Sequence, residues 1–222
     1  MKSKQVQEFK ETEIGRIPVD WEVKEVKEIS KVIDSLHKTP KYAQDGYPMV
    51  RVTDIESGPI NLKNTLKVTK EVYEEFTKNH KPRRNDVVIG RVGTYGITSY
   101  VDTDEQFCLG QNTAVIHSEF NNNFVYYALN SKLVKNQIEA RVVGSTQKTF
   151  SLQNIRELQI PIPTNSTEIS KITKILSDLD SKTSSLQNQN KILEQTAQAI
   201  FKSWFIDFDG VTEFENSELG QI

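Results

Sequence analysis

The chain has 222 residues, with 28 Lys and Arg against 30 Asp and Glu and a single cysteine. One cysteine excludes an internal disulfide framework and a thiolate metal cage, so Cys108 is expected to be a buried, small apolar residue. The N-terminus lacks the apolar core of a signal peptide, and no apolar run approaches the roughly 18 residues of a membrane span, which predicts a soluble, cytoplasmic protein.

The charge is unevenly distributed along the chain. Residues 31–100 carry 12 Lys and Arg against 8 Asp and Glu, whereas residues 164–222 carry 5 against 9. The N-terminal part can therefore present a basic face to a polyanion, although ordinary solvated lysines explain this modest excess about as well.

Short β-type runs and two helical stretches alternate up to residue 163. Runs rich in Val, Ile, Thr and Tyr and bounded by Gly, Asn or Asp predict strands at 49–55, 86–91, 96–101 and 113–117. Helical spacing predicts helices at 69–76, with Thr69 as N-cap, and at 124–140, after an Asn cap. The expected fold class is α+β, with a mixed α/β domain over residues 1–163.

The segment Ile160-Pro161-Ile162-Pro163 closes this domain. Because alternating prolines are incompatible with a central strand or a helix interior, the segment is predicted to be a stiff connector.

After the prolines, aliphatic residues recur at heptad spacing over residues 164–208. This pattern predicts one long coiled-coil helix, roughly 58 Å long from Glu168 to Ile206, whose apolar seam needs a partner helix. Packing of the seam on the chain's own domain is the alternative. The residues predicted to mediate dimerisation are Ile172, Leu176, Leu179, Leu186, Asn190, Leu193 and Ile200.

A short repeat links the two ends of the sequence. Residues 12–17, Thr-Glu-Ile-Gly-Arg-Ile, match residues 217–222, Ser-Glu-Leu-Gly-Gln-Ile, in chemical type. Residues 209–222 are therefore predicted to be an acidic tail that begins a truncated second repeat, which makes the chain one module of a two-module design.

Motifs of catalysis are missing from the sequence. It contains no phosphate-binding glycine loop, no dinucleotide fingerprint and no nucleophile elbow. His37, His80 and His117 share no ligand spacing and belong to different predicted elements. The sequence therefore predicts a non-catalytic protein without a metal or cofactor of its own.

Polar and basic motifs suit nucleic acid instead. The basic loop 38–42 and the cluster 81–84 predict phosphate contacts, through Lys38, Lys41, Arg83 and Arg84. The strand end at 51–54, the Gly-containing turn 91–96 and the polar loop 144–150 supply groups that can reach bases, although a plain turn or a solvated loop explains each motif alone. The residues predicted near bases are Arg51, Thr53, Arg91, Tyr95, Gln111, Ser145, Gln147 and Lys148.

The order and spacing of several motifs resemble a known family. They are Ile14-Gly15-Arg16-Ile17-Pro18 followed by Trp21, Gly93-Thr94-Tyr95-Gly96, Gly144-Ser145-Thr146-Gln147, the proline segment, the long helix and Lys202-Ser203-Trp204-Phe205-Ile206-Asp207-Phe208. Together they resemble the specificity subunits of type I restriction-modification systems.

The resemblance implies a target recognition domain for one half of a split DNA site, followed by a spacer helix that docks methyltransferase subunits. Members of this family usually carry two such modules, whereas this chain resembles a single-module, half form. It implies an antiparallel homodimer, a partner methyltransferase (modification) subunit that carries S-adenosylmethionine and methylates adenine, and a restriction/translocase subunit. The alternative is a non-catalytic assembly scaffold or a regulatory partner of a full specificity subunit.

Overall fold

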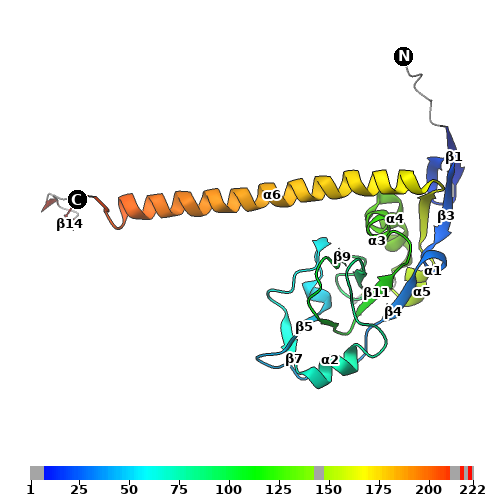
Figure 1. Cartoon of the computed structure of the whole chain (residues 1–222), viewed down its shortest axis with the longest axis horizontal. Helices are drawn as coiled ribbons and strands as arrows, with labels where there is room; N and C mark the ends of the chain where they lie inside the picture. Colours follow the sequence, from blue (N-terminus) through cyan, green and yellow to red (C-terminus); the bar gives the residue numbers. More distant parts are fainter. Residues whose placement is uncertain (1–7, 143–147, 211–215, 218–219, 222) are drawn as a thin grey trace, which may run out of the picture. The chain divides into compact units, whose positions relative to one another are not determined.

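The computed structural model describes residues 8–142, 148–210, 216–217 and 220–221. The chain divides into two compact units, residues 1–175 and residues 176–222, and each unit is considered by itself (Figure 1). Among the described residues, no helix is both long and apolar enough to cross a membrane.

A five-stranded sheet forms the centre of the first unit. Its strand order is β4-β11-β8-β9-β6, and all neighbours are antiparallel except β6 and β9. Val87 and Ile89 of β8 lie in one core cluster, and Val88 lies in another on the opposite face. Because both faces are covered, β8 is apolar at every position. The strands are β4 (Lys31–Asp34), β6 (Gly58–Pro59), β8 (Val87–Gly90), β9 (Thr98–Tyr100) and β11 (Thr113–His117).

Helices cover one face of this sheet. Phe124, Leu129, Ile138 and Ile155 join Val87 and the other inward residues of that face in the largest core cluster. The predicted helix 124–140 is two helices, because Ser131 adopts an extended backbone and caps the second helix through its hydroxyl. The helices are α1 (Val26–Ile29), α3 (Asn122–Asn130), α4 (Lys132–Arg141) and α5 (Leu152–Arg156).

A second, three-stranded sheet packs with α2 (Lys70–Phe76). It comprises β5 (Tyr47–Val50), β7 (Leu66–Val68) and β10 (Cys108–Leu109), in the order β10-β5-β7. The predicted strand 49–55 ends early, because the chain turns into the short 3-10 helix η1 (Val52–Asp54). Cys108 is buried as expected, and burial raises the pKa of its thiol to about 12.

The proline segment is a strand, not the predicted connector. Strand β12 (Gln159–Pro163) pairs antiparallel with β3 (Trp21–Glu25) in a two-stranded sheet. Prolines two residues apart have the same hydrogen-bonding phase, so both can face away from the single partner strand and leave the ladder intact.

The long helix α6 (Ser166–Phe205) follows β12, as predicted. Its first turns belong to the first unit, since Ile169 is buried in the main core cluster and Ile172 packs against that cluster. Trp21 Nε1 donates to Glu168 Oε1 at 3.3 Å at this junction. The first unit therefore extends past the predicted boundary at residue 163. Ile172, expected in the dimer seam, is partly buried against this core.

Two similar antiparallel strand pairs occur at the positions of the sequence repeat. In β1 (Phe9–Thr12) and β2 (Gly15–Pro18), Thr12 pairs with Gly15 and Glu11 with Arg16. In β13 (Asn216–Ser217) and β14 (Gly220–Gln221), Ser217 pairs with Gly220 and Asn216 with Gln221. The two strand pairs have the same register, so the match in chemical type extends to the pairing of the described strand residues.

Candidate nucleic-acid interface

Strands β5, β8 and β10 end at one edge of the first unit, and several predicted DNA-binding residues follow them there. Parallel strands β5 and β10 end side by side, so Arg51 and Gln111 follow them at the same edge. Gly110 N–H donates to the Val50 carbonyl at 2.8 Å, and Arg91 N–H donates to the Asn112 carbonyl at 2.9 Å. We call Arg51, Thr53, Tyr95, Gln111 and Lys148 the strand-end cluster.

The turn between β8 and β9 is held in place by its glycines. Gly93 and Gly96 have φ of 76° and 70°, the left-handed region that the sequence predicts for this turn. A Cβ atom at Gly96 would lie 2.7 Å from Ile138 Cγ2, whereas one at Gly93 would meet nothing within 4 Å. Gly96 therefore lets the turn pack directly on α4.

The predicted polar loop joins the same turn. Phe150 N–H donates to the Arg91 carbonyl at 2.7 Å, and Gly93 N–H donates to the Lys148 carbonyl at 3.3 Å. Lys148 Nζ lies 3.3 Å from Tyr95 Oη and 5.6 Å from the centre of its ring. Lys148 and Tyr95 are thus adjacent, while Ser145 and Gln147 lie outside the described residues.

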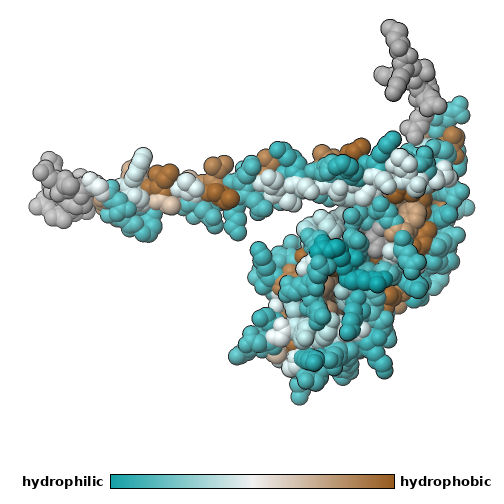
Figure 2. All heavy atoms as spheres, in the orientation of Figure 1, coloured by the Kyte–Doolittle hydropathy of each residue, from teal (hydrophilic) through white to brown (hydrophobic). Residues whose placement is uncertain are grey.

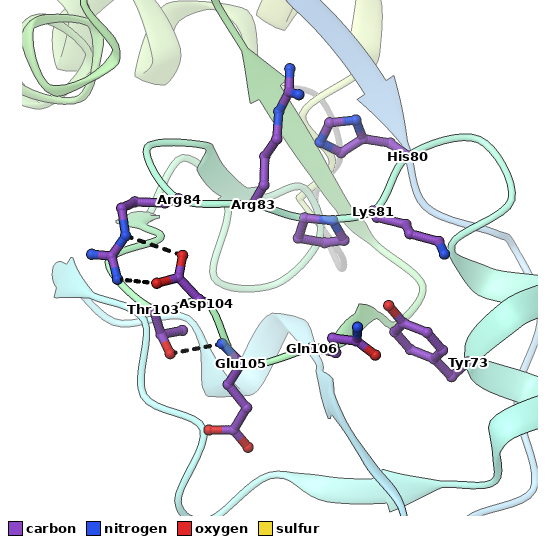
Figure 3. A pocket seen from close by; sticks show the side chains of 10 residues that line it. Tyr73, His80, Lys81, Arg83, Arg84, Thr103, Asp104, Glu105 and Gln106 are labelled. Atoms are coloured by element: carbon purple, nitrogen blue, oxygen red, sulfur yellow. Dashed lines mark hydrogen bonds and ion pairs between the residues drawn. The ribbon is translucent and has the colours of Figure 1, made fainter.

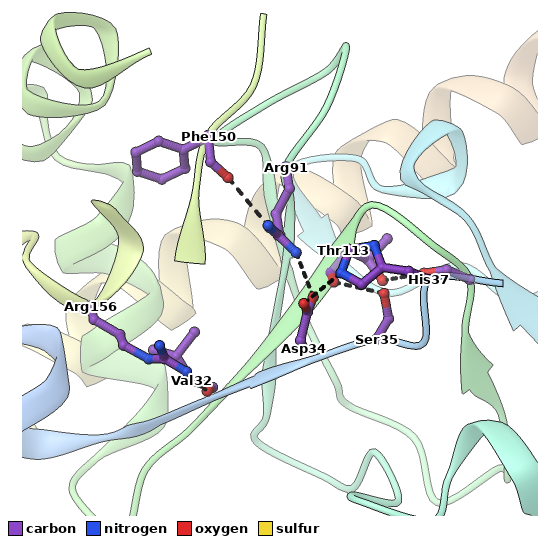
Figure 4. Close-up of polar contacts among 9 residues, drawn as sticks. Val32, Asp34, Ser35, His37, Arg91, Thr113, Phe150 and Arg156 are labelled. Carbon is purple, nitrogen blue, oxygen red and sulfur yellow. Dashed lines mark hydrogen bonds and ion pairs between the residues drawn. The ribbon is translucent and has the colours of Figure 1, made fainter. Parts of the chain in front are cut away.

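The side chain of Arg91, predicted to contact bases, is instead turned toward the protein. Its side chain is only 11% exposed and donates from Nη1 to Asp34 Oδ1 at 2.5 Å and from Nε to the Phe150 carbonyl at 3.4 Å (Figure 4). His37 Nε2 lies 2.7 Å from the other oxygen of Asp34. Arg91 therefore holds the end of the polar loop against β4, because it donates to the Phe150 carbonyl of the loop and to the Asp34 carboxylate of β4.

Arg51 is half-buried and Thr53 and Gln111 are exposed. Arg51 forms a two-bonded pair with Asp54, with distances of 2.9 Å and 2.8 Å from Nε and Nη2. These hydrogen bonds raise the pKa of Arg51. Thr94 Oγ1 donates to the Val52 carbonyl at 3.1 Å, which ties η1 to the turn.

Arg83 and Arg84 lie at the opposite end of β8. They precede β8 in a turn and Arg91 follows it, so a strand of four residues, roughly 13 Å, separates the two groups. A pocket of about 440 Å³ is lined there by Lys81, Arg83 and Arg84 together with Asp104 and Glu105 (Figure 3). Arg83 and Arg84, predicted to contact phosphates, thus lie at the end of β8 away from the strand-end cluster.

The two lysines of the basic loop differ in their surroundings. Lys38 Nζ forms an exposed ion pair with Glu75 of α2 at 2.7 Å, and Lys41 is exposed. Because Glu75 compensates the charge of Lys38, Lys41 is the better candidate for a phosphate contact in this loop.

One group of titratable side chains was not predicted from the sequence. Two histidines predicted to share no site, His80 and His117, converge on the fully buried Asp86, at 2.5 Å and 2.7 Å from its two oxygens. Burial opposes ionisation of Asp86, yet hydrogen bonds from His80, His117 and the Arg83 N–H keep its pKa below the ordinary value. Pairing of β11 with β8 brings the residues together, which no local spacing could reveal.

The predicted seam of α6 is exposed beyond Ile172. Leu179, Leu186, Leu193 and Ile200 have exposed fractions between 46% and 66%, and Leu176 is half-buried. Asn190 is exposed between them. Apolar side chains are visible along this part of the helix in Figure 2. Further exposed apolar side chains cluster at its end: Phe201, Trp204, Phe205 and Ile206.

Comparisons of the sequence with known proteins identify the family. A model of the type I restriction modification DNA specificity domain matches residues 18–195. The chain is 28% identical over 218 residues to the type I restriction enzyme MjaIX specificity subunit of Methanocaldococcus jannaschii, covering 95% of this chain and 49% of that protein. It is 29% identical over 229 residues to the putative MjaX specificity subunit of the same organism, covering 96% and 52%. The chain thus spans about half the length of these curated relatives.

Solved structures show the same fold. The S subunit of the type I restriction-modification system from M. genitalium superposes with a TM-score of 0.63 at 19% identity, covering 86% of this chain and 46% of that one. The HsdS subunit from Thermoanaerobacter tengcongensis gives 0.55 at 15% identity, covering 89% and 47%. The predicted fold, a mixed domain followed by one long helix, is thereby confirmed.

Proposed function

The chain belongs to the family of type I restriction modification DNA specificity domains, and we propose that it acts as a half-subunit that recognises one half of a bipartite DNA target. Its relatives are specificity subunits, which are non-catalytic. The observation that carries the proposal is the strand-end cluster, in which donors from four separate chain segments meet at one edge of the domain.

The chemistry of this cluster suits base readout. Arg and Lys donate to the guanine edge, and Gln forms paired hydrogen bonds with adenine in the major groove. Arg51, Gln111 and Lys148 supply these groups at one edge. We assign the phosphate contacts to Lys41 and Arg83, because contacts to the DNA backbone position a protein on the duplex without reading its sequence.

Pairing of α6 with the same helix of a second copy is the second part of the proposal. A row of exposed Leu and Ile at heptad spacing supports it, since such a row is stable when covered by a matching helix. Two-fold symmetry of an antiparallel pair predicts a palindromic, bipartite target with one half for each copy.

Catalysis is assigned to partners. We propose that the dimer recruits a methyltransferase (modification) subunit, which carries S-adenosylmethionine and methylates adenine, and a restriction/translocase subunit. The exposed Phe201, Trp204, Phe205 and Ile206 support docking of protein at the end of α6, because contiguous exposed apolar side chains mark protein interfaces.

The same apolar end favours a second candidate. In that case the chain is an assembly scaffold or a regulatory partner of a full specificity subunit and does not select DNA. The excess of acidic residues over 164–222 agrees with protein contacts at the helix under both proposals.

An electrophoretic shift with duplex DNA of varied sequence, with and without a methyltransferase subunit, separates the two proposals. Sequence-selective binding that depends on the partner is expected. Truncating Gln147 should relax sequence choice, whereas removing Arg83 should weaken binding to all DNA alike and lower the salt slope by about one. Absence of selective binding under both conditions would favour the scaffold.

A further inference from the structure

A chain of hydrogen bonds runs from the buried carboxylate of Asp86 through His117 of β11 to the exposed guanidinium of Arg83. Asp86 is fully buried, and the side chains of His80 and His117 are each only 14% exposed. His117 Nδ1 lies 2.7 Å from Asp86 Oδ1, and its Nε2 lies 2.5 Å from Arg83 Nη2. Arg83 itself is exposed.

The chemistry of these partners fixes the tautomer of His117. A carboxylate only accepts hydrogen bonds, so Nδ1 must carry the proton that faces Asp86. Arginine only donates, so Nε2 must be the unprotonated acceptor. Only the neutral imidazole with a proton on Nδ1 satisfies both contacts. Asp86 thus prepares His117 to accept a hydrogen bond from Arg83.

A neutral acceptor has a different electrostatic effect from a charged one. Arg84 pairs with Asp104 through bonds of 3.2 Å and 2.8 Å, which compensates its charge. Arg83 is held by an uncharged ring and keeps its charge for an external anion. Figure 3 shows the side chain of Arg83 directed away from Asp104 and Glu105, whereas Arg84 turns toward Asp104.

Side chains of both charges lie around His117, including Lys31, Glu28 and Glu119. Lys31 of β4 is its direct cross-strand partner in the ladder, and Lys31 is exposed. Side chains at such paired positions lie on the same face of a sheet, within about 5 Å at Cβ. Lys27 and Glu119 also border this surface. Lys27 is paired with Glu25.

We propose that Asp86 and His117 form a relay that orients Arg83 toward a phosphate of the DNA backbone, which makes His117 a positioning residue for DNA binding. The inference rests on the proposed DNA-binding function and names the anion that this end of β8 recognises. One hydrogen bond to His117 restricts the guanidinium and leaves its other N–H groups for a bidentate phosphate contact.

The same atoms also suit a divalent metal, because the ligand atoms of His80, Asp86 and His117 all lie within 4.8 Å of one another. Arg83 argues against that use. A metal on His117 Nδ1 would leave the proton on Nε2, where it would face an arginine N–H at 2.5 Å. Two donors cannot share that contact, so the geometry favours the relay.

A double-mutant cycle with non-specific duplex DNA tests the relay on the full chain. His117→Phe keeps an aromatic ring but removes the acceptor, and it should weaken binding about fivefold. In an Arg83→Ala background the same substitution should have no further effect. His37→Phe is the matched control, since His37 also bonds an aspartate but does not contact Arg83, and it should leave affinity unchanged.

Nitrogen-15 spectra of labelled histidine provide an independent readout without DNA. We expect His117 as the neutral tautomer with the proton on Nδ1, and Asp86→Asn should abolish this preference. An Nε2–H tautomer, or tight 1:1 binding of Zn²⁺, would overturn the relay. Equal loss of affinity from His117→Phe in both backgrounds would show a merely structural role and overturn it as well. If the wild-type chain binds no duplex, the proposed function fails together with this role of Arg83.

Discussion

Two arginines flank strand β8, and the groups that accept their hydrogen bonds determine whether each side chain supports the fold or is available to a ligand. Arg91 follows β8 and points inward to a carboxylate and a carbonyl, so its donors serve the fold. Arg83 precedes β8 and is held by a neutral imidazole, so its charge stays available. Their sequence contexts do not distinguish them, and only the partner residues do.

Removing the inward arginine should cost stability. Arg91→Ala would leave Asp34 without its closest cation and the Phe150 carbonyl without a donor, and we expect a loss of about 2–3 kcal/mol in the free energy of unfolding. Urea unfolding followed by circular dichroism measures it. Arg84→Ala is the matched control, because its ion pair with Asp104 is exposed and should leave the urea midpoint unchanged. Equal midpoints for the two variants would contradict this account of Arg91.

Elements with a regular sequence period were predictable, and those formed by context were not. Alternating and continuous apolar residues located β8 and β11, and heptad spacing located α6. The prolines of β12 suggested a connector, since the single partner strand that tolerates them is distant in sequence. The helix at 124–140 was predicted without its break at Ser131, because a serine cap inside an apolar helical pattern has little effect on the period.

In the candidate site, too, the features that arise from local motifs were predictable, and those that arise from contacts between distant segments were not. Tyr95 and Lys148 were predicted from local motifs, and the structure places them in contact. The inward orientation of Arg91 and the convergence of His80 and His117 depend on which strands pair. Pairing between distant strands is set by the whole core, so a residue type and its immediate neighbours do not reveal these partners.

The glycines of the β8–β9 turn offer a matched test at the scale of an element. Gly96→Ala and Gly93→Ala both place a Cβ at positive φ, which costs about 1–2 kcal/mol each. Only Gly96→Ala also collides with Ile138, so it should destabilise the protein by about 1–3 kcal/mol more. Thermal unfolding of both variants measures the difference. A larger loss for Gly93→Ala would mean that the turn does not pack on α4 as described.

At the scale of the whole molecule, the exposed seam of α6 bears on the proposed pairing of two copies. Leu179, Leu186 and Leu193 are apolar side chains at heptad spacing that are exposed in the single chain. Covering one Leu side chain contributes about 1.5–3 kcal/mol, so several covered together can hold a dimer.

Leu186→Asp should therefore dissociate the dimer. A buried, unpaired carboxylate in the seam is unfavourable, and we expect the variant to sediment as a monomer at concentrations where the wild-type chain is a dimer. Ser185→Asp adds the same charge one residue away from the seam and should leave the dimer intact. Analytical ultracentrifugation over a dilution series measures both. A wild-type chain that remains monomeric throughout would refute pairing through α6.

The exposed seam has a consequence for gene dosage. If each copy holds only half of the recognition surface, occupancy of a complete site rises with the square of protein concentration below the dimer dissociation constant. Modest changes in expression would then switch the modification of a genome more steeply than a single polypeptide with both surfaces allows.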